Sequence, residues 1–109
     1  NSANVRRAEL EYKQLQVERD KAIAELATKL AVMRSNLMTL EERMQENNTI
    51  INELKDKNKS IQRLVAKKVV SPLEENDAKV ELLEQTIEYE KNRITAIAIT
   101  NGIQILTEY

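Results

Sequence analysis

The chain contains no cysteine, histidine, phenylalanine or tryptophan, and only one glycine, one proline and three tyrosines. Without cysteine and histidine it has no disulfide, no thiolate and no imidazole, so the commonest metal ligands and proton shuttles are missing. Without bulky aromatic side chains, a rounded core is hard to fill. We therefore expect no catalytic residue, no metal, no cofactor and no enzymatic activity, and an elongated fold in place of a globule.

The chain also lacks an excess of charge of either sign, because it has 17 basic and 18 acidic residues. Nothing in this balance favours nucleic acid as a partner, whose phosphates demand a basic surface. The most apolar stretch, residues 94–106, is too short to cross a bilayer and is broken by Asn101 and Gly102. We expect no membrane contact by these residues.

A heptad pattern is what the sequence does have, and it indicates a coiled coil. Residues at alternating spacings of four and three form a seam: Leu26, Leu30, Met33, Leu37, Leu40, Met44, Asn47, Ile51, Leu54, Asn58, Ile61 and Val65. Upstream, the stripe continues through Ala8, Tyr12, Leu15, Arg19 and Ala22, and joins the seam by two consecutive four-residue steps, a stutter. The pattern predicts one helix over about residues 5–68.

The segment around Pro72 predicts a tip at 69–72 and a second helix over about 72–100. Ser71 is a favourable N-cap, Pro72 suits the first helical position, and Glu74 stands where a capping-box acid lies. The fold class we expect for 1–109 is all-α, a long antiparallel two-helix coiled-coil hairpin.

The second helix carries an apolar stripe of its own. Its members are Leu73, Asn76, Val80, Leu83, Ile87, Glu90, Ile94 and Ile97. If the chain reverses near Val69, facing residues have numbers that sum to about 138. The expected layers are Val65 with Leu73, Asn58 with Val80, Leu54 with Leu83, Ile51 with Ile87, and Met44 with Ile94.

Polar residues interrupt these layers at two places. The register sets Asn47 opposite Glu90, where the two side chains can satisfy each other. Asn58 faces an apolar side chain and has no partner in this scheme, although a lone buried polar group costs about 1 to 3 kcal/mol.

Near the tip a basic cluster faces an acidic one, which predicts pairing between the helices: Lys55, Lys57, Lys59, Arg63, Lys67 and Lys68 against Glu74, Glu75, Asp77, Glu81 and Glu84.

Both ends of the chain leave alternatives open. Residues 95–109 are rich in β-branched residues around Asn101-Gly102, which favours a β-hairpin locally, whereas a continued helix to about Thr100 would pair with the region of Leu40. On a sum of 138, Tyr109 reaches only to about Lys29. Residues 5–28 then need either a longer returning helix or a second subunit.

The tip resembles that of membrane fusion proteins, the HlyD-like periplasmic adaptors. The positions that match the family pattern are Leu64, Lys67, Val70, Ser71, Glu74 and Ala78. In the family an Arg, a Leu four residues later and a Ser seven after that dock on an outer-membrane channel. Leu64 and Ser71 keep this spacing, while Ser60 holds the Arg position and Lys68 replaces the usual Gly.

The resemblance implies a structural adaptor hairpin of a bacterial secretion or efflux complex. Its implied partner-binding tip is Ser60, Leu64, Lys67 and Ser71, and its implied partners are a TolC-like outer-membrane channel, other hairpins in a ring, and an inner-membrane transporter reached through domains that these residues do not contain. The implied location is the periplasm, in a protein anchored to the inner membrane.

A second reading of the sequence is a parallel coiled-coil dimer that acts as a cytoskeletal or tethering scaffold. Asn58 at an a position is typical of parallel dimers, in which such a residue fixes the register. In that arrangement Pro72 interrupts the rod instead of reversing it.

Overall fold

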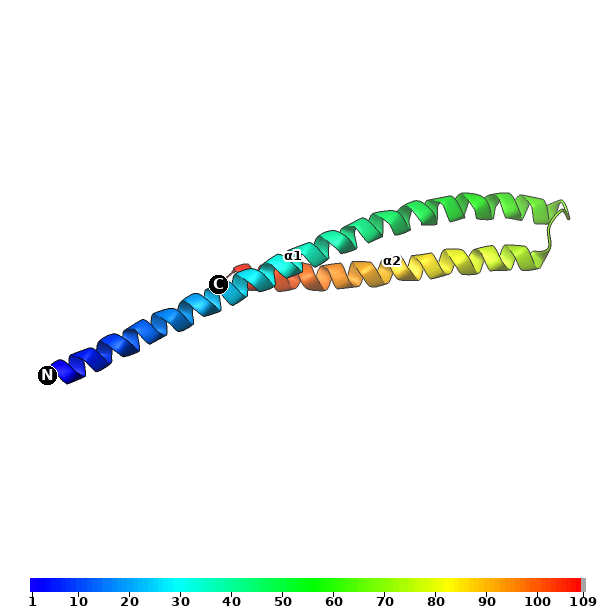
Figure 1. The fold of residues 1–109 in the computed structure, drawn as a ribbon. Coiled ribbons are helices and arrows are strands. Elements are labelled where there is room, and N and C mark those ends of the chain that lie inside the picture. The colour runs from blue at the N-terminus through cyan, green and yellow to red at the C-terminus, as the bar shows by residue number, and fades with distance from the viewer. Residues whose placement is uncertain (109) are drawn as a thin grey trace.

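The computed structural model describes residues 1–108 and consists of two α-helices, α1 (Ser2–Ala66) and α2 (Pro72–Thr107), which lie side by side and run in opposite directions (Figure 1). The molecule measures 98 × 17 × 16 Å. The expected all-α antiparallel hairpin is confirmed, with no strand among the described residues. The predicted reach of Tyr109 lies outside them.

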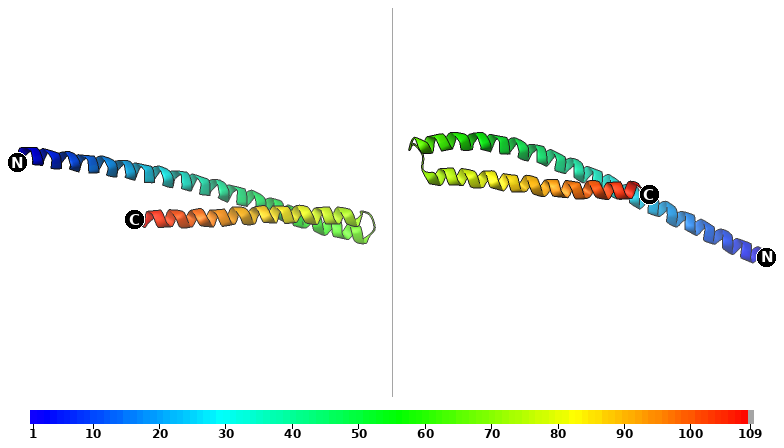
Figure 2. Two further views of the ribbon diagram at one scale, coloured as in Figure 1. Left: turned by 90° about the horizontal axis from the view of Figure 1, so that it is seen from below. Right: turned by 180° about the vertical axis from the view of Figure 1, so that it is seen from behind.

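Helix α1 is one uninterrupted rod because nothing in Ser2–Ala66 breaks it. The segment has no proline or glycine, and the Asn1 side chain caps its first turn by accepting a hydrogen bond from the backbone N–H of Ala3 at 2.9 Å. The helix begins three residues before Val5 and ends two residues before Lys68. Its N-terminal part runs on past the end of α2, as the two further views also show (Figure 2).

The tip is a tight reversal that closes the end of α1. The N–H of Lys68 bonds to the carbonyl of Val65, and the N–H of Val69 to the carbonyl of Leu64, both at 2.9 Å. Lys68 has φ 62°, the left-handed conformation that glycine adopts most easily. This is a Schellman motif with lysine in the glycine position, and it satisfies carbonyls that the helix end would leave open.

Helix α2 begins at Pro72, where the capping signals place it. Ser71 is extended, with φ −78° and ψ 154°, and its hydroxyl oxygen accepts from the N–H of Glu74 at 3.4 Å. The helix continues to Thr107, so the β-hairpin alternative is wrong and the expected end near Thr100 is seven residues too early. Ile99, Ile103 and Leu106 are half-buried, and this packing against α1 outweighs the β preference of the segment.

The predicted seam of α1 is confirmed from Leu30 to Val65. All its members there are buried or half-buried: Leu30, Met33, Leu37, Leu40, Met44, Asn47, Ile51, Leu54, Asn58, Ile61 and Val65. Only three of the apolar ones, Leu40, Ile51 and Leu54, fall below 9% exposed. The hairpin therefore has a thin core, because α2 alone covers the seam of α1 and the flanks of each layer face solvent.

The predicted stripe of α2 is wrong, because the helix is turned about its axis. The six apolar residues among its eight expected members are 45 to 68% exposed and form what we call the outer stripe: Leu73, Val80, Leu83, Ile87, Ile94 and Ile97. The residues that face α1 form the inner stripe: Ala78, Leu82, Gln85, Tyr89, Asn92 and Ala96. All five predicted layers therefore fail on their α2 side.

The axial register, in contrast, is close to the expected one. The pairs Lys57 with Glu81 and Asn47 with Asn92 join residues whose numbers sum to 138 and 139. The reversal point is thus right and the rotation of α2 is wrong. Two small buried residues of the inner stripe, Ala78 at 4% and Ala96 at 9% exposed, let the helix axes approach where larger side chains would hold them apart.

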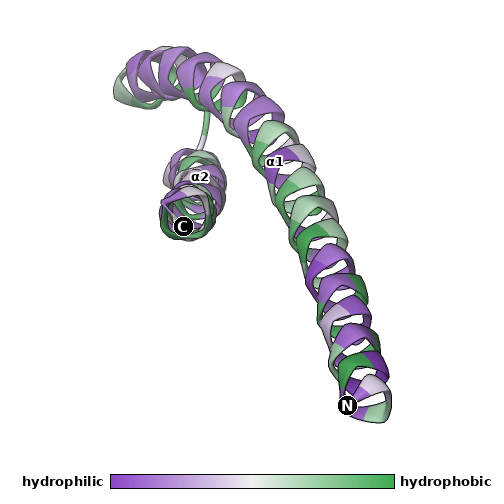
Figure 3. Ribbon diagram, turned by 90° about the vertical axis from the view of Figure 1, so that its left-hand side faces the viewer, coloured by the Kyte–Doolittle hydropathy of each residue, from purple (hydrophilic) through white to green (hydrophobic). Residues whose placement is uncertain are grey.

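The first 29 residues have no partner helix among the described residues, as expected for 5–28. Every residue from Asn1 to Lys29 is exposed, including Leu10 at 67% and Leu15 at 63%. We call residues 2–29 of α1 the arm. Seen from the N-terminal end, hydrophobic residues recur along the arm although no second helix lies beside it (Figure 3).

Candidate functional site

The four residues of the predicted tip site lie at the distal end of the hairpin. Ser60 and Leu64 are in the last two turns of α1, Lys67 is its C-cap, and Ser71 is the N-cap of α2. The first three are spaced by four and three residues, which places them on one face of the helix. All four are exposed, and Leu64 keeps 37% of its surface in solvent.

The Ser71 hydroxyl already has a structural role. Its oxygen accepts the hydrogen bond from the Glu74 N–H, and Glu74 and Glu75 add negative charge to the first turn of α2. The hydroxyl hydrogen is free to donate to a partner. A substitution at Ser71 therefore changes the start of α2 as well as any docking contact, and tests of this residue need a variant that keeps the cap.

Charge pairing between the helices near the tip is limited to one contact in the part of the chain that the structure describes. Lys57 and Glu81 approach to 3.7 Å with half of each side chain in solvent. Glu75 pairs along its own helix with Lys79 at 3.2 Å. Exposed pairs of this kind contribute under about 1 kcal/mol, so charge does not hold the tip closed.

A polar layer crosses the middle of the hairpin. The Asn92 side-chain amide donates to the Asn47 carbonyl oxygen at 3.0 Å, and the Asn47 amide donates to the Gln85 carbonyl oxygen at 3.2 Å. Asn47 and Asn92 are each 9% exposed. Buried amides that bond to each other avoid the cost of unmet hydrogen bonds and fix which face of α2 meets α1.

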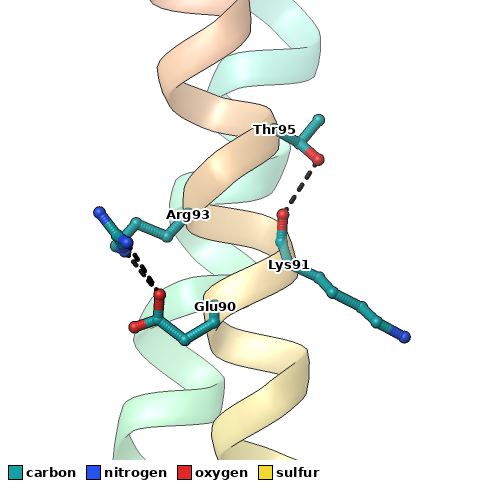
Figure 4. Close-up of polar contacts among 4 residues, drawn as sticks. All are labelled: Glu90, Lys91, Arg93 and Thr95. Carbon is teal, nitrogen blue, oxygen red and sulfur yellow. Dashed lines mark hydrogen bonds and ion pairs between the residues drawn. The ribbon is translucent and has the colours of Figure 1, made fainter.

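The expected partner of Asn47, Glu90, is half-buried and faces its own helix instead. Its carboxylate accepts from Arg93 at 2.9 Å, three residues along α2, while Thr95 nearby bonds back to the carbonyl of Lys91 (Figure 4). Placing Asn92 at Asn47 satisfies that residue with a neutral amide and spares the burial of a charge. The predicted register places Glu90 at Asn47, and the rotation of α2 brings Asn92 there in its place.

Among the residues that the structure describes, Asn58 has the one buried side-chain atom without a hydrogen-bond partner, and the predicted register likewise gives Asn58 no partner. It is 9% exposed and its side-chain oxygen is buried without a hydrogen-bond partner. This atom is a local weakness of the fold near the tip.

Neither helix is long and apolar enough to cross a membrane within residues 1–108. The same residues contain no group of three or more acidic side chains arranged to hold a metal ion.

Comparison with known proteins gives no relative, because no protein-family model, no curated protein and no solved structure matches this chain. What is shown for this chain is therefore its fold, an all-α helical hairpin.

Proposed function

We propose that this chain is the adaptor hairpin of a bacterial secretion or efflux complex, which spans the periplasm and docks by its tip onto a TolC-like outer-membrane channel. The observation that supports this function most is the build of the tip. Both helix ends are closed by their own hydrogen bonds, so Ser60, Leu64, Lys67 and Ser71 are presented on a firm end without help from another chain.

The length of the hairpin suits a spacer. The tip lies at the opposite end of the 98 Å rod from the N-terminus, and α2 ends part-way along α1, so the tip acts on a partner at a distance (Figure 1). Leu64 supplies the apolar contact, Lys67 a charge-assisted hydrogen bond, and the Ser60 and Ser71 hydroxyls donate to backbone carbonyls of the channel.

Binding of the chain to a purified TolC-class channel in nanodiscs tests this function. Leu64→Gln removes the apolar contact, and Ile50→Gln is its matched control, since Ile50 lies on the same helix at 38% exposed against 37% for Leu64. We expect affinity to fall roughly tenfold for Leu64→Gln and to stay unchanged for Ile50→Gln. Equal effects, or no binding by the unaltered chain, contradict the proposal.

Ser71→Asp separates docking from capping. Aspartate accepts from the Glu74 N–H as serine does but cannot donate, so the start of α2 persists while the docking donor is lost. Reduced channel binding with unchanged helicity supports a docking role for Ser71. Full binding by this variant assigns Ser71 to the cap alone.

A second candidate function is the parallel coiled-coil scaffold, which the buried oxygen of Asn58 favours. A second copy running in the same direction would bring a donor to this atom, and the pair would act as a tether. Asn58→Leu discriminates the two functions, because in a parallel scaffold it strengthens association but loses the single register and the strict dimer state, whereas it leaves channel docking intact.

A further inference from the structure

Helix α2 has apolar residues on two opposite sides, and only one side is covered. Members of the inner and outer stripes are two residues apart, as in Ala78 with Val80 and Asn92 with Ile94, which is about 200° around a helix of 3.6 residues per turn. Helix α1 covers the inner stripe. The outer stripe is the more apolar of the two and faces solvent at 45 to 68% exposure.

Helix α1 has one stripe that faces the same way along its whole length. The arm positions Ala8, Tyr12, Leu15, Arg19 and Ala22 lead into the seam through the stutter at Leu26, which restores the angle that the heptad drift removes. From Leu30 onwards the stripe meets α2. Along the arm the same side of α1 is bare, so a second α2 is what would complete it.

The bare part of α1 and the bare side of α2 are similar in length. The 28 residues of the arm span about 42 Å, and the outer stripe from Leu73 to Ile97 spans about 36 Å at 1.5 Å per residue. Each chain thus carries one uncovered surface of each kind, on different helices and at opposite ends of the rod.

We propose that the occupant of the outer stripe is the arm of a second copy of this chain, in an antiparallel dimer with two-fold symmetry. The two α1 helices form the outer sides of the dimer, and the two α2 helices lie end to end between them. Each α2 packs against its own α1 on one side and against the partner's arm on the other. Two helices of 36 residues measure about 108 Å end to end, close to the 98 Å length of the hairpin.

The exposed area of the single chain supports this assembly. The hairpin exposes 8803 Å², whereas a compact monomer of 12.6 kDa exposes about 6,200 Å². The excess is roughly three times the ~800 Å² that each partner buries in a standard interface. Two elongated chains therefore have ample surface for a stable dimer.

Charge is compatible with the same pairing. Residues 72–97 of α2 carry seven acidic and three basic side chains, while the arm carries six basic and five acidic ones. A net negative helix meets a slightly positive arm, whereas two α2 helices packed on each other through their outer stripes would bring like charge together. The arm is the better occupant on this ground.

The inference does not rest on the channel-docking proposal. In the antiparallel dimer the two tips point in opposite directions and stay free at the ends. Failure of channel binding therefore leaves the dimer untouched.

Sedimentation equilibrium of the full chain measures the assembly, and we expect twice the 12.6 kDa chain mass. Leu83→Gln with Ile87→Gln removes two outer-stripe contacts and should raise the dissociation constant roughly 100-fold, at about tenfold per side chain. Leu15→Gln with Leu26→Gln should do the same from the arm. The matched control, Val32→Gln with Met38→Gln, alters side chains 53% and 63% exposed on the far side of α1 and should leave the dimer intact.

The direction of the chains is read by a distance between copies. The chain has no cysteine, so Glu18→Cys in one sample and Lys91→Cys in another give unique spin labels when the two are mixed. In the antiparallel dimer these positions are neighbours, and we expect a distance below about 25 Å. Copies aligned with their tips together would separate them by about 40 Å along the axis.

Three results would overturn the inference: a monomer at all concentrations, a long distance between the labels, or dissociation by the control variant to the same extent. Circular dichroism of each variant guards against unfolding, because the substituted side chains are exposed in the hairpin and their loss should leave its helicity unchanged.

Discussion

The two faces of α2 differ in a way that hydrophobicity alone does not explain. The inner stripe, which meets α1, contains two alanines, an asparagine and a glutamine beside one leucine and one tyrosine, whereas the outer stripe is made of leucine, isoleucine and valine. Helix α1 covers the inner stripe because the small residues there allow the two helices to approach closely and the side-chain amides there form hydrogen bonds with Asn47. Fit and hydrogen-bond pairing thus select the face, and the remaining apolar face is left for another partner.

The largest expected effect on stability is the difference between two leucine truncations, one in the buried seam and one in the exposed outer stripe. Leu54 is 6% exposed in the seam, and Leu83 is 58% exposed in the outer stripe. Leu54→Ala should lower the free energy of unfolding by about 2 to 3 kcal/mol, and Leu83→Ala by under about 0.5 kcal/mol. Urea unfolding of dilute, monomeric chain checks this, and equal losses would mean that α2 is turned the other way.

The polar layer should respond next. Asn92→Ala leaves the Asn47 oxygen buried without its donor and should cost about 1 to 2 kcal/mol. Replacing both residues by leucine removes the need for pairing and should recover most of that loss. A double-mutant cycle measures the coupling, and additive costs would show that the two amides do not meet.

The tip should be improved by glycine at one lysine and harmed by it at the next. Lys68 has φ 62°, so Lys68→Gly relieves the crowding of its Cβ and should stabilise the hairpin by about 0.5 to 1 kcal/mol. Lys67 has φ −86°, so Lys67→Gly adds only flexibility and should destabilise it slightly. Thermal unfolding of both variants compares them, and a gain at both positions would refute the role of the left-handed turn.

The smallest effect is expected at Gly102. Alanine is favoured over glycine inside a helix by about 1 kcal/mol, but its Cβ would lie 2.7 Å from the Cε of Met33. The methionine end is flexible and can move, so Gly102→Ala should stabilise by about 0.5 kcal/mol. In a Met33→Ala background the full gain should appear; a loss there would indicate strain elsewhere in α2.

The sequence predicts the hairpin, its reversal point and the seam of α1, because these depend on local signals: a heptad repeat, a serine cap and a proline. It does not predict the rotation of α2, since that helix carries two candidate stripes and counting apolar residues selects the wrong one. Local propensity also does not predict that α2 continues past Gly102, because packing on α1 decides where this helix ends. The tip residues Ser60, Leu64, Lys67 and Ser71 were placed by resemblance, and their docking role is still a prediction.

The most direct test of the account is the pattern of nuclear Overhauser contacts across the hairpin in dilute chain. The inner face of α2 packed on α1 predicts contacts from the side-chain amide protons of Asn92, on α2, to the side chain of Asn47, on α1. Contacts between the methyl groups of Ile51 and Ile87 in their place would contradict it, because they would put the outer stripe against α1 and leave no bare face for a second copy.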